Sequence, residues 1–452
     1  MGQTFTETAG AVGYHAISKA RSTFYAWVVF ALIFALLMSD YMSRQVLNAV
    51  FPHLKLEWGL TDGQLGSLSG IVALMVGLLT LPFSLLADRW GRVKSLAIMA
   101  LLWSASTLAC GLAANYGHML AARFFVGVGE AACGSVGLAV ILSAFPASMR
   151  ATLTGAFTSG GMFGAVLGMA LGGVVATHFG WRAAFVAMAL FGLVVVLFYA
   201  LIVTEGRLAR RTHAGAMAAI ANTRAAGRDS LPLPATLRAV FGAPSLVFAY
   251  LGSGLQLFTV FAIVAWMPSY LNRYYSMAPD KSALAAAVLL IVSGVGMTLC
   301  GILTDWISRK APGRKVKLAY IYCLLSCVLL MAALRLAPGN AQLLLISGGV
   351  LVAAGTWGPA GAMVANLARP AIHSTALATL TLANNLLGAA PAPFLTGVLA
   401  DHIGLLGALQ VVPLVSLAAA TLFILAGRKY QRDLALAEQQ NEVERAAERA
   451  ST

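Results

Sequence analysis

Four charged residues interrupt long apolar runs in the first half of the sequence, namely Asp40, Arg44, Arg123 and Glu130. An arginine among apolar residues is a permanent cation, and its planar guanidinium can bind a carboxylate through two parallel hydrogen bonds. A carboxylate beside it can take up and release a proton, so a proton and an organic anion can compete for one arginine. We therefore expect Arg44 or Arg123 to bind an anion and Glu130 or Asp40 to carry a proton. The alternative is two structural ion pairs without a ligand.

The spacing of these charges predicts that they lie on helices. Asp40 and Arg44 are four residues apart and Arg123 and Glu130 are seven apart, so each pair shares one helix face. With a rise of about 1.5 Å per residue, we expect the two arginines in one layer and the two carboxylates in a second, deeper layer. A charge at such depth in a membrane usually faces a cavity and a partner.

The composition is that of an integral membrane protein. Of the 452 residues, 60% are hydrophobic and 10% are charged, whereas soluble domains have about 25% charged residues. A bilayer core is crossed by about 20 apolar residues. Apolar runs of this length predict twelve helices, at approximately 24–50, 64–86, 95–113, 118–141, 152–177, 183–204, 245–270, 282–304, 317–336, 341–364, 374–400 and 405–427. The predicted fold class is therefore all-α integral membrane, with two six-helix bundles at 24–204 and 238–427.

The distribution of basic residues predicts the orientation in the membrane. The net charge is +14, and most of the 30 Lys and Arg residues fall on one side when the N-terminus is cytoplasmic. We therefore expect both termini in the cytoplasm, with tails at 1–23 and 428–452 and a cytoplasmic linker at 205–237. Because the loops account for the positive charge, it gives no argument for nucleic-acid binding.

Two blocks of the first half recur in the second half. Residues 84–92 match 301–309, which places Asp88 opposite Asp305 and Arg92 opposite Arg309. Further on, Gly164, Gly173, His178 and Gly180 recur as Gly388, Gly397, His402 and Gly404. Six helices repeated in the same orientation imply two bundles related by an axis along the membrane normal. A ligand site is then expected between the bundles near mid-membrane.

Several motifs resemble those of the major facilitator superfamily of secondary transporters. The loop 85–94 is similar to its signature of an acidic residue followed by a basic, glycine-containing turn. The helix at 118–141 carries the Arg-xxx-Gly-x-Gly element from Arg123, and the helix at 152–177 is glycine-rich. Gly164 is followed by Ala165, where the antiporter form has Gly-Pro, and this departure argues against a drug antiporter.

Within this superfamily, three segments resemble the spinster-like branch, at 127–131, 179–185 and 384–388. That branch tends to have an Asp directly before the first-helix arginine, where this chain has Ser43 before Arg44. Asp40, one turn away, is expected to take its place. The superfamily resemblance implies that the first and fourth helices both line the cavity, so the four buried charges converge there.

The resemblance also implies a gate at the cytoplasmic ends of the helices, where charged pairs close one side while the other is open. The expected gating residues are Asp88, Arg89 and Arg92 in the first half, with Asp305 and Arg309 in the second. The second half has no charge deep in an expected helix. Its candidates for orienting a substrate are polar or aromatic, namely Gln256, Thr259, Trp357, Asn384 and Asn385.

The sequence predicts no cofactor. The five cysteines form no CxxC or Cys/His spacing, so no metal site is expected, and no phosphate-binding loop indicates use of ATP. A proton gradient is the expected energy source, and we expect a monomer in the plasma (inner) membrane of a bacterium. The substrate is expected to be a small or amphipathic molecule.

Three further functions compete with a proton-coupled carrier of a small carboxylate. The first is the same fold carrying a lysolipid or another amphipathic lipid, as the spinster-like resemblance allows, and it would need a cavity that opens laterally to the bilayer. The second is a membrane-embedded enzyme, which the sequence disfavours because no histidine lies deep in an expected helix. The third is a passive facilitator or a sensor.

Overall fold

The structure is a computed structural model that describes residues 4–206, 240–309, 313–368 and 372–451. Within these ranges the chain is helical and contains no β-strand. The elements are α1 (Thr4–Trp58), α2 (Asp62–Trp90), α3 (Arg92–Gly111), α4 (Tyr116–Glu130), α5 (Cys133–Ala144), η1 (Ala147–Met149), α6 (Arg150–Phe179), α7 (Trp181–Ile202), α10 (Pro244–Tyr274), α11 (Pro279–Ser308), α12 (Arg314–Ala333), α13 (Asn340–Ala354), α14 (Trp357–Leu367), α15 (His373–Ala383), the π-helix η3 (Asn384–Ala389), α16 (Pro391–Val411) and α17 (Leu414–Ser451).

Hydropathy confirms the all-α membrane class. Within the described ranges, eleven helical stretches are long and apolar enough to cross a membrane. The expected spans 118–141 and 341–364 are each built from two helices, α4 with α5 and α13 with α14. The twelfth expected span, 405–427, is divided at Pro413 between the end of α16 and the start of α17. A proline there interrupts the helix because it lacks an N–H donor.

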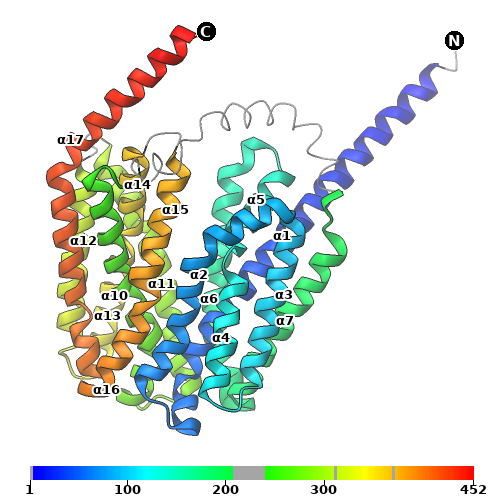
Figure 1. Ribbon diagram of the computed structural model, residues 1–452. Coiled ribbons are helices and arrows are strands. Elements are labelled where there is room, and N and C mark those ends of the chain that lie inside the picture. The colour runs from blue at the N-terminus through cyan, green and yellow to red at the C-terminus, as the bar shows by residue number, and fades with distance from the viewer. Residues whose placement is uncertain (1–3, 207–239, 310–312, 369–371, 452) are drawn as a thin grey trace.

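The helices form two bundles that lie side by side (Figure 1). The first contains α1 to α7, the second contains α10 to α17, and both chain ends lie at the same face of the molecule. The expected tails at 1–23 and 428–452 are largely helical, because α1, the first helix of the chain, begins at Thr4 and α17, the last helix, ends at Ser451. The expected linker 205–237 lies outside the described residues from position 207 onward.

Packing within each bundle is apolar, and so is much of the outer surface. Trp103 of α3 and Phe185 of α7 are fully buried within the first bundle. By contrast, Leu197 of α7 is 57% exposed and Val328 of α12 is 63% exposed. A soluble protein would rarely expose so many large apolar side chains on its helices, whereas a bilayer covers them.

Glycines at equivalent positions of the two halves let the bundles approach closely. A Cβ atom on Gly173 of α6 would lie 2.2 Å from a side chain of α11, and one on Gly397 of α16 would lie 2.2 Å from the carbonyl oxygen of Asp62 on α2. Gly180 and Gly404 also share a left-handed backbone, with φ of +87° and +76°. The sequence repeat therefore corresponds to a repeat of backbone geometry and of contacts between bundles.

Charged contacts join the bundles at the face opposite the chain ends. Asp62, at the start of α2, accepts hydrogen bonds of 2.6 and 2.7 Å from the guanidinium of Arg273 on α10, and one of 2.6 Å from Nζ of Lys55. Asp401 of α16 accepts from the backbone N–H groups of Asp62 and Gly63 at 2.7 and 2.8 Å. A carboxylate of the second bundle thus caps the first turn of α2.

Candidate functional site

Arg44 on α1 is the centre of a buried charge cluster. Its Nε lies 3.0 Å from Oδ1 of Asp40, one helical turn earlier, as the spacing of four residues predicts. The same Nε lies 2.8 Å from Oε2 of Glu130, which α4 places across from α1. Oγ of Ser43 donates to the other oxygen of Glu130 at 2.7 Å. One cation therefore faces two carboxylates, and both carboxylates are almost fully buried.

The break after α4 gives Glu130 its position. The helix ends at this residue, Ala131 and Ala132 form a turn, and α5 begins at Cys133. The sequence predicted that Glu130 would share a face with Arg123. In the structure both residues lie on α4, and Glu130 pairs with Arg44 on the neighbouring helix. The described residues therefore form one cluster around Arg44 and not the two separate arginine–carboxylate pairs of the structural alternative.

Arg123 is held by backbone carbonyl groups. Its side chain is buried, with the residue 1% exposed. Its Nη1 donates to the carbonyl oxygen of Ser43 at 2.8 Å and its Nε to that of Leu68 at 3.2 Å. No carboxylate within the described part of the chain forms an ion pair with Arg123. Since a buried charge is costly without a counter-charge, this guanidinium is suited to a bound anion.

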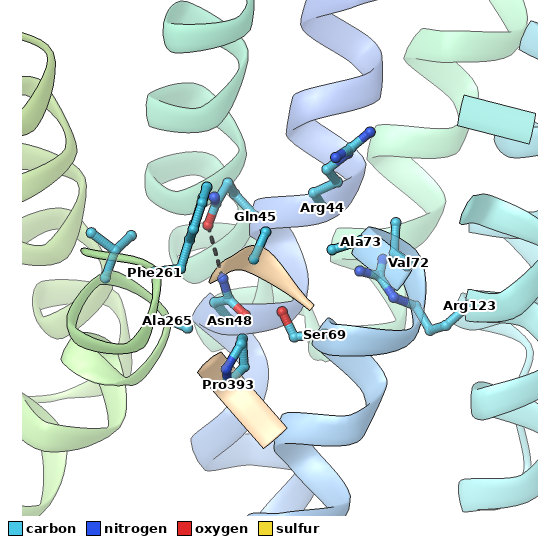
Figure 2. Close-up of a pocket in the computed structure, with 12 residues that line it drawn as sticks. Arg44, Gln45, Asn48, Ser69, Val72, Ala73, Arg123, Phe261, Ala265 and Pro393 are labelled. Atoms are coloured by element: carbon cyan, nitrogen blue, oxygen red, sulfur yellow. Dashed lines mark hydrogen bonds between the residues drawn. The ribbon is translucent and has the colours of Figure 1, made fainter. Parts of the chain in front are cut away.

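Arg44 and Arg123 line one cavity between the two bundles. The cavity has a volume of about 70 Å³, and its walls come from α1, α2 and α4 on one side and from α10, η3 and α16 on the other. Figure 2 shows polar side chains beside the arginines, where Nδ2 of Asn48 donates to Oε1 of Gln45 at 2.9 Å. Phe261 of α10 adds an apolar wall from the second bundle.

The other charges of the cluster stand behind Arg44. Neither Asp40 nor Glu130 lines the cavity itself, and both reach it only through this arginine. Because Arg44 lines the cavity and also pairs with both carboxylates, an anion in the cavity and a proton on a carboxylate can act on the same cation.

The candidates from the second half do not line this cavity. Gln256 and Thr259 of α10 are fully buried within the second bundle, where Gln256 donates to Ser326 and Thr259 shares a hydrogen bond with Ser416. Both bonds are 3.0 Å long and connect α10 to α12 and α17. Their role in substrate binding stays a prediction.

The remaining candidates of that half lie near helix ends. Trp357 begins α14 and is 42% exposed. Asn384 and Asn385 begin η3, and Nδ2 of Asn385 donates to the carbonyl oxygen of Thr381 at 3.0 Å. The last residue of η3, Ala389, lines the cavity. The π-helix thus contributes backbone and a methyl group there, while its amide side chains lie elsewhere.

Three polar wall residues had not been predicted from the sequence, namely Gln45, Asn48 and Ser69. A signal for two of them was available, because Asn48 follows Arg44 by one helical turn and Gln45 is its direct neighbour. Ser69 carries no such signal, since a single serine in an apolar helix is common. Phe261 carries none either.

The expected gating residues lie at the face of the chain ends. Arg92, the first residue of α3, forms an ion pair of 2.8 Å with Asp88 near the end of α2, and both side chains are about half exposed. Nζ of Lys315 lies 3.9 Å from Asp305, and Arg309 is exposed. Among the residues that the structure describes, no ion pair joins the bundles at this face. The charged contacts between the bundles are those of Asp62 at the opposite face.

Comparison with known proteins decides the family. The sequence model described as "Major Facilitator Superfamily" matches residues 33–390. The chain belongs to this superfamily.

The relatives of this superfamily member include a protein named as an L-galactonate transporter and a spinster protein. The chain is 25% identical over 293 residues to "Probable L-galactonate transporter" of Escherichia coli K12, an alignment that spans 64% of each chain. It is 24% identical over 408 residues to "Protein spinster homolog 1" of Xenopus laevis, which covers 86% of this chain and 74% of that one. The alignment with the first relative therefore spans less than two thirds of its length.

Solved structures show the same fold. A bacterial homolog of the human lysosomal transporter spinster, in an inward-facing and unoccupied conformation, superimposes with a TM-score of 0.79 at 20% identity, covering 90% of this chain and 98% of that one. This superfamily member is accordingly an integral membrane transporter with the two-bundle fold and a resemblance to the spinster branch. It is not an enzyme.

Proposed function

We propose that this transporter moves a small organic anion of the carboxylate type, coupled to protons by alternating access. The observation that carries the proposal is the cavity between the bundles, which the buried Arg123 and the partly buried Arg44 line, while two buried carboxylates pair with Arg44. A relative named for L-galactonate, a carboxylate, supports the same substrate class. The cavity is small and partly polar, which suits a compact anion.

In this proposal Arg123 and Arg44 bind the carboxylate. Arg123 uses Nε and one Nη on backbone carbonyls, so its position is fixed before a ligand arrives. A guanidinium fixed in this way can offer its remaining N–H groups to a carboxylate without losing further side-chain freedom. Gln45 and Asn48, on the same wall, are placed to orient polar groups of the substrate.

Glu130 or Asp40 carries the proton. When Arg44 pairs with both carboxylates, the cluster holds two negative charges and one positive charge. An anion that draws Arg44 toward the cavity leaves the carboxylates without their cation, and a bound proton then removes the unfavourable buried charge. Substrate and proton thus act on each other through one arginine. The proton gradient supplies the energy, and no cofactor is needed.

Alternating access would exchange contacts at the two faces. The structure closes the face opposite the chain ends through Asp62 and its partners. We propose that the cytoplasmic face closes in the other state through Asp88, Arg89, Arg92, Asp305 and Arg309. In this orientation both termini are cytoplasmic, and the protein acts as a monomer in a bacterial inner membrane without binding nucleic acid.

Uptake into proteoliposomes with an imposed pH gradient tests the proposal. The wild type should concentrate a labelled carboxylate such as L-galactonate, and Glu130→Gln should lose this accumulation while keeping the hydrogen bond to Ser43. Glu57→Gln is the matched control. Glu57 lies at the end of α1, pairs with Arg182 and does not line the cavity. If Glu130→Gln concentrates substrate as well as the wild type, Glu130 is not the coupling residue.

The second candidate is transport of a lysolipid or another amphipathic lipid. An apolar groove of about 390 Å³ between α2 and α16 supports it. Other residues of the same two helices line the cavity that contains Arg44 and Arg123, so the groove lies next to that cavity. Leu74 of α2 and Phe394 of α16 are among its lining residues. The resemblance to spinster proteins points the same way. Presenting a lysolipid in the uptake assay distinguishes the two candidate functions. Uptake of the lipid without uptake of the carboxylate would make lipid transport the preferred function.

A further inference from the structure

A second cavity lies between α12 and α17, near the face of the chain ends. It has a volume of about 540 Å³. Arg314, Lys317 and Tyr320 line it from α12, and Arg428 and Gln431 line it from α17. This cavity is far along the helices from Arg44, which lies in the other bundle. It is therefore separate from the transport site.

The cavity carries positive charge without a local counter-charge. Its three basic side chains, Arg314, Lys317 and Arg428, are exposed. In the described part of the chain none of them forms an ion pair, and the only hydrogen bond involving them runs from Arg314 to the carbonyl oxygen of Ile307 at 3.3 Å. The nearby carboxylate of Asp433 is occupied, because it accepts a hydrogen bond of 3.0 Å from the backbone N–H of Ser245.

The wall from α17 is held in place by contacts to other helices. Asp433 caps the start of α10 through the backbone and hydroxyl of Ser245. Nδ2 of Asn366, on α14, donates to the hydroxyl of Tyr430 at 3.1 Å. These contacts fix the turn of α17 that carries Arg428. The three basic residues therefore lie on two packed helices and not in a loop.

An apolar stripe runs from the cavity toward the middle of the membrane. On α12, Lys317 is followed at helical spacing by Ile321, Leu324 and Val328, which are 44%, 38% and 63% exposed. On α17, Ile424 lines the cavity and Leu417 lies two turns deeper, with 36% and 41% exposed. A ligand with an anionic head and apolar tails matches this order of cations above aliphatic side chains.

We propose that this cavity binds the headgroup of an anionic phospholipid from the leaflet at the face of the chain ends. The phosphate accepts hydrogen bonds from Arg314, Lys317 and Arg428, and the acyl chains lie along the exposed stripes of α12 and α17. Basic pockets between membrane helices bind acidic headgroups in this way, and each Lys or Arg near the surface contributes about fivefold in affinity. A free phosphate would satisfy the cations but would leave the stripes unused.

Lipid binding to the purified, detergent-solubilised protein tests this site. Phosphatidylglycerol should raise the melting temperature more than phosphatidylcholine with the same acyl chains, and native mass spectrometry should show its retention. The triple variant Arg314→Gln, Lys317→Gln, Arg428→Gln should bind phosphatidylglycerol on the order of 100-fold more weakly, from about fivefold for each cation. The single variant Lys317→Gln should show about fivefold, which provides the test if the triple variant does not fold.

The matched control removes three exposed cations away from this cavity, with Lys94→Gln, Arg150→Gln and Arg335→Gln. It changes the net charge equally and should keep the preference for phosphatidylglycerol. Equal loss in both triple variants would overturn the proposal, because it would indicate attraction by overall charge alone. A melting-temperature increase with inorganic phosphate as large as that with phosphatidylglycerol would overturn the lipid assignment. So would a wild type that does not distinguish the two lipids.

Discussion

Arg123 is buried and Arg44 is partly buried, and their different surroundings indicate different roles. Arg44 is shared by two carboxylates and contacts the ring of Tyr41 at 5.3 Å, so its charge is already compensated in the state observed. Arg123 is oriented by the carbonyl oxygens of Ser43 and Leu68 and has no acidic partner among the described residues. The ligand is therefore expected to meet Arg123 as its fixed anchor and Arg44 as the group that responds.

Replacement of Arg123 by lysine tests this fixed anchor. Lysine keeps the charge, but a single ammonium cannot hold two carbonyl oxygens and also bind a carboxylate through two parallel N–H groups. Hydrogen bonds to charged groups contribute about 1.5–3 kcal/mol, so Arg123→Lys should raise the KM for uptake about 10- to 100-fold. Uptake kinetics in proteoliposomes measure the effect. Arg182→Lys, at a pair with Glu57 outside the cavity, serves as control and should leave KM within about twofold.

At the scale of helices, the sequence predicted the spans well because a membrane imposes one simple requirement, a long apolar run. It also predicted the contact of Asp40 with Arg44, since spacing within one helix fixes such a pair. The family resemblance implied that the charges of the first and fourth helices converge, but the specific pairing of Glu130 with Arg44 was not predicted, because it depends on how α1 and α4 face each other. The breaks at Ala131 and Gly355 were missed for another reason: the apolar run continues through both.

The contact of α2 with α16 determines how closely the bundles approach. A Cβ atom on Gly66 would lie 2.2 Å from the carbonyl oxygen of Pro393, a residue that also walls the cavity. Gly66→Ala should therefore separate the two helices and destabilise the observed state by about 1–3 kcal/mol. A lower melting temperature in detergent would show this. Gly301→Ala, on α11 with no atom near the added methyl group, should leave the melting temperature unchanged or slightly higher.

At the scale of the whole molecule, the two faces differ in how the bundles are joined. Asp62, which is 3% exposed, binds Arg273 of the other bundle with two hydrogen bonds, and Asp401 holds the same helix start from α16. At the face of the chain ends, the described residues of the two bundles share no ion pair, and Asp88 of α2 pairs with Arg92 of α3 inside the first bundle. The observed state is therefore closed opposite the chain ends by contacts that the opposite state must break.

Arg273→Gln should shift the molecule away from this closed state. The substitution removes two hydrogen bonds to a buried carboxylate while Lys55, in the same bundle as Asp62, still compensates its charge, so folding should survive. The ratio of closed to open molecules should fall roughly tenfold, from the loss of charged hydrogen bonds of about 1.5–3 kcal/mol each, partly replaced by water.

Spin labels at Leu112→Cys and Lys281→Cys, one on each bundle, report the separation as a longer distance population. Arg182→Gln breaks an ion pair within one bundle and should leave the distances unchanged. Equal distance distributions in the wild type and Arg273→Gln would show that the glycine contacts of α2 with α16 and of α6 with α11 close this face without the charges, because these contacts remain intact in the variant.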